Sequence, residues 1–110
     1  MARNKVVTLE EALAKCHDGM TIMLSGFTNV GSPNKFCRAL ADTGIKDLHI
    51  IANDAGNDKV DGIGTFIVEG RAASLVASHV GLNPKVAEQM NAGTLQVTLV
   101  PQGTLAERIR

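Results

Sequence analysis

Residues 18–33 read "DGMTIMLSGFTNVGSP", an apolar run that passes directly into small residues and stops at a proline. The run at 20–24 is too short for a free-standing helix and too apolar for a solvated strand, so it predicts a strand buried on both faces. Ser32 is expected to cap a helix that has Pro33 at its first position and stops at Gly44. A buried strand that feeds a helix through a glycine loop is typical of an α/β sheet.

The same alternation of helix and strand extends outward from this stretch. Thr8 and Glu11 have the spacing of a capping box, and a helix is expected from there to Cys16. Further strands and helices are predicted by short apolar runs and by glycine or proline punctuation: strands at 48–53, 73–78 and 95–100, and helices at 61–70, 83–93 and 103–110. The pattern predicts an α/β domain with an open, mostly parallel sheet and helices on both faces.

The amino-acid composition limits the classes of function that the chain can have. The chain has 110 residues, of which 45% are hydrophobic, so it can bury one core, and we expect a single domain over 1–110. Its 11 basic and 11 acidic residues leave no positive field for nucleic acid or an anionic membrane. No apolar run approaches the roughly 18 residues of a membrane span. Cys16 and Cys37 lack a CxxC partner, which predicts free thiols and a cytoplasmic location.

Ligands of parallel sheets bind at the carboxyl ends of the strands, so the polar and small residues there are the candidates. Gly26 and Gly31 allow close approach of a ligand to the backbone, although an ordinary tight turn explains them equally well. Asn53 and Asp54 are polar candidates there: an amide can bind an oxygen of a ligand, whereas an Asx turn is the more common use of both residues. Gln102 presents an amide at the end of the last strand, and its spacing does not separate these two roles.

Other chemical groups are sparse. The three histidines lie too far apart in the sequence for a metal site, and only His79 is expected near the ligand edge. Arg108 and Arg110 form a terminal basic pair of the kind that is usually solvated. The sequence has no serine in a glycine elbow and no acid–base pair on one loop. It therefore predicts a protein that holds a ligand without a complete catalytic set.

The quoted stretch resembles the signature of the family I CoA-transferases, which contains, in this order, Asp-Gly, three apolar residues (here at 22–24), Gly-Gly-Phe, three variable residues, Gly, one more residue and Pro. Every fixed position matches except Ser25, where the family usually has glycine. The stretches "IANDAG", "ASHVGLNP" and "VPQGTLAERIR" are similar to the alpha subunits of acetate and acetoacetate CoA-transferases. The resemblance covers essentially the whole chain. It implies a domain of that fold that is incomplete at its C-terminus.

The resemblance also implies an activity. CoA would move between acids such as acetate, acetoacetate or butyrate through a glutamyl-CoA intermediate, with CoA as a substrate and with no cofactor or metal. The glutamate belongs to the beta subunit, so no catalytic residue is expected in this chain. A hetero-oligomer with that subunit is expected. Substrate and CoA would contact five residues: Gly26, Phe27, Gly31, Asn53 and Gln102.

Asp54 stands where many relatives carry a second asparagine. Two alternatives remain at this stage: a sugar-phosphate isomerase-like domain, and a non-catalytic fragment that only binds a partner subunit.

Overall fold

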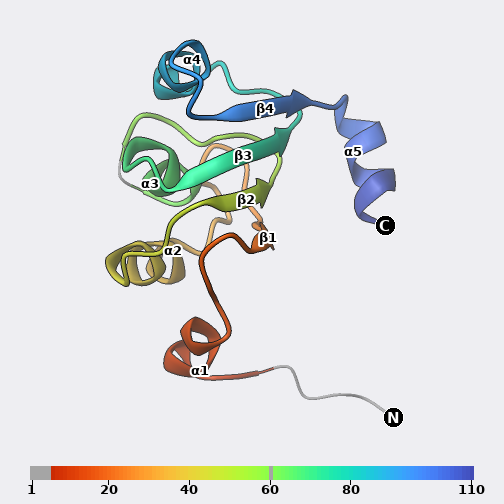
Figure 1. The fold of residues 1–110 in the computed structure, drawn as a ribbon. Coiled ribbons are helices and arrows are strands. Elements are labelled where there is room, and N and C mark those ends of the chain that lie inside the picture. The colour runs from red at the N-terminus through yellow and green to blue at the C-terminus, as the bar shows by residue number, and fades with distance from the viewer. Residues whose placement is uncertain (1–5, 60) are drawn as a thin grey trace.

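The computed structural model describes residues 6–59 and 61–110, in which helices and strands alternate along the chain (Figure 1). The elements in chain order are α1 (Leu9–Ala14), β1 (Thr21–Met23), α2 (Asn34–Asp42), β2 (Leu48–Ile51), α3 (Ile63–Val68), β3 (Ala72–Ala77), α4 (Pro84–Asn91), β4 (Gln96–Leu99) and α5 (Gln102–Ile109). Each of these elements was expected from the sequence, and the α/β class is confirmed.

The four strands form one parallel sheet in the order β1-β2-β3-β4. Connections between parallel strands are right-handed almost without exception. When strands follow one another across a sheet in chain order, right-handed connections place every connecting helix on the same face. This geometry puts α2, α3 and α4 on one face, and α1 packs against α2. Helices on both faces of an open parallel sheet were expected; the open parallel sheet is confirmed, and the three connecting helices of the described residues share one face of it.

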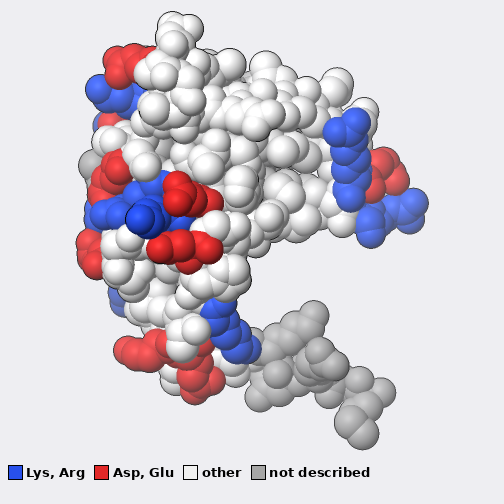
Figure 2. Space-filling view, in the orientation of Figure 1, with Lys and Arg blue, Asp and Glu red and all other residues white. Residues whose placement is uncertain are grey.

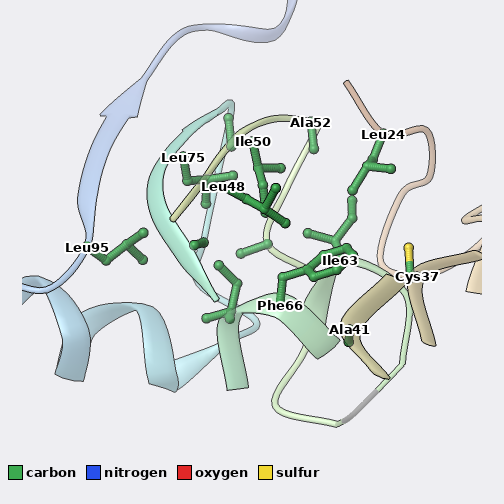
Figure 3. Close-up of a cluster of buried hydrophobic side chains, with 14 of the residues drawn as sticks. Leu24, Cys37, Ala41, Leu48, Ile50, Ala52, Ile63, Phe66, Leu75 and Leu95 are labelled. Atoms are coloured by element: carbon green, nitrogen blue, oxygen red, sulfur yellow. The ribbon is translucent and has the colours of Figure 1, made fainter. Parts of the chain in front are cut away.

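The core lies between the helices and the inner face of the sheet (Figure 3). Ile50 and Leu75 are neighbours in the sheet register and are at most 1% exposed. They face Ile63 and Phe66 of α3, which are equally buried. Burying a side chain of this size contributes about 1.5–3 kcal/mol. The inner face therefore supplies most of the hydrophobic stabilisation of the domain.

The outer face is different. In β1 the side chain of Met23 is 56% exposed, and His49 of β2 is exposed as well. His49 Nδ1 lies 2.6 Å from Ser74 Oγ on the neighbouring strand, a polar pair suited to contact with water. The prediction that residues 20–24 are covered on both faces is wrong in the described structure. The alternation of β1, in which Ile22 is half-buried between two exposed residues, is that of a strand with one covered face.

Two helix starts test the capping predictions. Thr8 caps α1 by accepting a hydrogen bond from the backbone N–H of Glu11 at 3.2 Å, as expected. Ser32 does not cap α2, which begins one residue later than predicted, after Pro33. The hydroxyl of Ser32 is buried without a hydrogen-bond partner and is packed against Gly26. The predicted position of this helix is therefore confirmed to within one residue, and the prediction that Ser32 caps it is wrong.

Charged side chains gather beside α2 and α3 and on α5, whereas the surface between them is largely uncharged in this view (Figure 2). The first group centres on Arg38, which contacts Asp42 at 2.8 Å and Glu69 at 2.7 Å. The hydrogen bond from Arg38 lowers the pKa of Glu69, and Arg71 adds to the effect. Both cysteines are free, as predicted. No helix in the described residues is long and apolar enough to cross a membrane.

Candidate functional site

Three of the predicted site residues meet at the carboxyl edge of the sheet. The side-chain amide of Asn53, after β2, donates a hydrogen bond to the backbone carbonyl of Gly26, after β1, at 2.9 Å. The amide of Gln102, at the start of α5, donates to Asn53 Oδ1 at 2.8 Å. These contacts join positions 27 and 49 residues apart in the sequence. These three residues therefore lie together at one edge of the sheet, while their part in binding a substrate stays a prediction.

The amide groups retain donors for a ligand. Each carboxamide has two N–H bonds and an oxygen with two lone pairs. Within the described residues, Asn53 and Gln102 each donate one N–H to the other loops. A second N–H on each remains, and Gln102 is exposed at the surface. The edge can therefore donate hydrogen bonds to a carboxylate or to a thioester oxygen without carrying a charge that titrates.

The glycine loop contains a tight turn that the sequence did not reveal. Phe27 and Val30 exchange two backbone hydrogen bonds of 2.9 Å, and Thr28 and Asn29 between them have φ values of 50° and 73°. Positive φ at both central residues is the feature of a type I′ turn, which favours asparagine and glycine. Asn29 was the residue in the sequence that could have indicated this turn. The loop is thus a small two-residue hairpin, and its tip is not made of glycine.

The two glycines of this loop have roles inside it. Gly26 has a φ of 122°, and a Cβ there would collide with Ser32 Oγ. Gly31 has a φ of 79° and open space around it. Ser25, the residue that departs from the family signature, donates its hydroxyl hydrogen to the carbonyl of Gly31 at 3.0 Å. The bare backbone at Gly26 is therefore needed for the loop to fold on itself.

Asp54 is buried directly beneath this turn, with 1% of its surface exposed. Its Oδ2 accepts the backbone N–H of Thr28 at 2.7 Å, and its Oδ1 accepts that of Gly56 at 2.8 Å. The second bond is an Asx turn, so the predicted structural use of this residue is present. His79 Nε2 lies 3.7 Å from the carboxylate. The ring of His79 also meets Phe27 edge-on, with the ring centroids 5.4 Å apart.

The loop after β2 is held from the other side by residues that sequence reasoning missed. Ser78 donates both its backbone N–H and its hydroxyl to the carbonyl of Asn53, at 2.9 and 2.8 Å. Asn83 is 1% exposed and donates its amide to the carbonyl of Ala55 at 3.0 Å. Both follow β3, a region that was singled out only for His79. These bonds fix the backbone that carries the two polar side chains of the site.

A hollow of about 650 Å³ lies elsewhere, lined by α2 together with Leu9 and Asp61. Two of its charged groups, Arg38 and Asp42, already pair with each other. It brings together none of the strand ends. Among the residues that the structure describes, no three His, Cys, Asp or Glu side chains form a group that could hold a metal ion. The carboxyl edge is therefore the stronger candidate for the site.

The amino-acid sequence that forms these elements and loops matches a known family. The family described as "Coenzyme A transferase" matches residues 6–110. The chain belongs to this family. The resemblance stated from the loop signature is confirmed, and membership in the CoA-transferase family favours that interpretation over a sugar-phosphate isomerase-like domain.

Curated members of the CoA-transferase family align over nearly all of the chain. "Acetate CoA-transferase subunit alpha" of Escherichia coli (strain K12) is 47% identical over 109 residues, which are 98% of this chain and 49% of that protein. "Probable coenzyme A transferase subunit alpha" of Bacillus subtilis (strain 168) is 48% identical over 106 residues, 96% of this chain and 46% of that protein.

"Acetoacetyl-CoA:acetate/butyrate CoA transferase alpha subunit" of Clostridium acetobutylicum is 41% identical over 107 residues, 97% of this chain and 49% of that protein. The chain spans about half the length of these curated relatives.

Proposed function

We propose that the chain forms the substrate-binding part of the alpha subunit of a short-chain acyl-CoA:carboxylate CoA-transferase. The acids would be short ones such as acetate, acetoacetate and butyrate, in line with the activities named for the relatives from Escherichia coli and Clostridium acetobutylicum. The working enzyme would be a cytoplasmic hetero-oligomer with a beta subunit. Coenzyme A would be a substrate, with no further cofactor.

The observation that carries this proposal is the hydrogen-bonded series from Gln102 through Asn53 to the carbonyl of Gly26. It places neutral amide donors at the edge of a parallel sheet where ligands bind. Such donors stabilise the oxygen of a thioester carbonyl as negative charge develops on it. Asp54 is not one of these donors, because both oxygens of its carboxylate accept hydrogen bonds from the loop backbone, at Thr28 and Gly56.

The nucleophile would come from the beta subunit. A glutamate carboxylate there would attack the acyl-CoA carbonyl, and the C–S bond would break. The products of this step would be free CoA thiolate and an acyl anhydride on the glutamate. The thiolate would then attack the glutamyl carbonyl and release the donor acid, which leaves a glutamyl-CoA thioester. The acceptor acid would reverse both steps. In each of them Asn53 and Gln102 would bind the substrate oxygen and orient the reacting carbonyl.

A chimera tests this function. Residues 1–110 replace the matching half of the alpha subunit from Escherichia coli, and the product is assembled with the beta subunit of that enzyme. We expect CoA exchange between acetyl-CoA and acetoacetate or butyrate. Asn53→Ala and Gln102→Ala should each lower kcat/KM by about 10²-fold, since each removes a donor to the developing oxyanion.

Asn91→Ala is the matched control, because Asn91 is an exposed amide at the end of α4, and it should leave kcat/KM unchanged. A chimera that assembles with the beta subunit yet exchanges no CoA would support the non-catalytic alternative. Equal kcat/KM values for all three variants and the parent would show that the amides of Asn53 and Gln102 do not contribute to the reaction.

A further inference from the structure

The turn at residues 27–30 adopts a backbone that its sequence disfavours. Thr28 has a φ of 50°, and a β-branched residue is a true outlier in that region. Asn29, with a φ of 73°, tolerates it better. Strained backbone of this kind persists only where the surroundings hold it in place, and it clusters at functional sites. The turn therefore needs an anchor outside itself.

Asp54 is placed to be that anchor. Its Oδ2 accepts the N–H of Thr28 at 2.7 Å and lies 3.5 Å from the Thr28 hydroxyl. Hydrogen bonds to an ionised carboxylate are stronger than bonds between neutral groups. The carboxylate cannot relax away, because its other oxygen binds Gly56 and the following carbonyl, of Ala55, is held by Asn83. Asp54 thus links the strained turn to a fixed loop.

The turn carries groups of the candidate site on both sides of the strained pair. Gly26, just before it, offers the carbonyl that accepts from Asn53. Phe27 is 58% exposed and packs its ring against His79. A turn that opened would move both. The turn's geometry is therefore coupled to the position of the amide donors.

We propose that Asp54 is a positioning residue: its buried carboxylate holds the Thr28–Asn29 turn in its left-handed conformation, and so sets Phe27 and the Gly26–Asn53 contact for the substrate. An amide in its place supplies one acceptor oxygen and one donor. Whichever way the amide is turned, one of the two N–H groups of Thr28 and Gly56 then faces another donor. The role in the reaction rests on the proposed function, whereas the role in the turn does not.

Hydrogen exchange of backbone amides in the full 110-residue chain tests the anchor directly, with NMR as the readout. In Asp54→Asn, the amides of Thr28 and Val30 should exchange at least tenfold faster than in the parent. The amide of Leu24, which donates to Ile51 in the sheet, should keep its protection. Asp58→Asn changes an exposed neighbouring carboxylate and should affect neither. Unchanged protection at Thr28 in Asp54→Asn would overturn the proposal.

A second substitution separates anchoring from a general loss of structure. Thr28→Gly removes the disfavoured side chain, so the turn needs its anchor less. In Thr28→Gly/Asp54→Asn, the Val30 amide should regain protection to within about threefold of the parent. If the double variant stays as unprotected as Asp54→Asn, strain at Thr28 is not what Asp54 offsets, and the proposal fails.

In the chimeric enzyme, Asp54→Asn should lower kcat/KM about tenfold, because the disturbed Gly26–Asn53 contact moves an amide donor away from the substrate oxygen. The double variant should restore kcat/KM to within about threefold of the parent. An unchanged kcat/KM in Asp54→Asn, or a loss that the double variant does not restore, would contradict a positioning role. If the parent chimera exchanges no CoA, the proposed function fails, and the exchange measurements still decide whether Asp54 holds the turn.

Discussion

The two faces of the sheet share one hydrogen-bonding register and differ in what covers them. On the inner face Ile50 and Leu75 are at most 1% exposed beneath α3, whereas on the outer face Met23 is 56% exposed. Backbone pairing is the same for both faces, so it does not cause the difference. The strand order does, because strands that follow in chain order receive all their connecting helices on one side. The apolar residues of a strand therefore indicate how much of its surface can be buried. The strand order determines which face of the sheet the connecting helices bury.

The largest expected contrast is in stability. Leu75→Ala opens a cavity on the inner face and should lower the free energy of unfolding by about 2–5 kcal/mol. Val76→Ala, one residue along on the half-buried outer face, should cost no more than about 1 kcal/mol, since fewer contacts are lost. Urea unfolding followed by circular dichroism gives both values. Equal losses would mean that the outer face is as closely packed as the inner one.

Thiol reactivity sharpens the same contrast. Burial, helped by the charge of Asp61, raises the pKa of Cys37 to about 11, and this side chain is fully covered on the inner side. Burial also raises the pKa of Cys16, which is only half-buried after α1. We expect Cys16 to react with a disulfide reagent at least tenfold faster at pH 8, because the thiolate is the reacting form. Single Cys→Ala variants assign each rate, and similar rates would contradict the burial of Cys37.

The smallest effect concerns the ion pairs on the helical side. Arg38 lowers the pKa of Glu69, so this pair stabilises the fold above the unfolded carboxyl pKa of about 4.3, and the stabilisation is lost as pH falls through the lower folded value. Because the Arg38 side chain is 41% exposed, solvent screens this pair, and we expect it to contribute less than either contrast above.

Urea titrations of the parent and Glu69→Gln should therefore differ more at pH 7 than at pH 3. Glu88→Gln, which removes an exposed partner of Lys85, serves as the control and should show a smaller difference at pH 7. A gap between the parent and Glu69→Gln that stays the same at both pH values would rule out the Arg38–Glu69 charge interaction as its source.

Local signals in the sequence predicted much of the fold. Thr8 with Glu11, the proline at the start of α4 and short apolar runs located elements to within a few residues. The error at Ser32 has a physical cause, because its hydroxyl packs inside the loop instead of reaching the helix. Whether both faces of the sheet would be covered could not be read from apolar runs, since such runs do not reveal strand order.

Some features of the candidate site could likewise be predicted from the sequence, and others could not. The positions of Asn53 and Gln102 at strand ends predicted that they would gather, because carboxyl ends of parallel strands share an edge. The roles of Asp54, Ser78 and Asn83 depend on contacts across 25 or more residues, which spacing along the chain does not encode. The turn at Thr28 was hidden for another reason: threonine is a poor residue for positive φ, and only a partner remote in sequence makes it tenable there.

In the proposed enzyme, this chain would hold the substrate while another subunit would supply the nucleophile. The most direct measurement is peptide mass spectrometry of the chimeric enzyme after incubation with acetoacetyl-CoA and no acceptor acid. We predict a CoA thioester on a glutamate of the beta subunit, with a yield that falls in Asn53→Ala. A CoA adduct on any residue of this chain would contradict the claim.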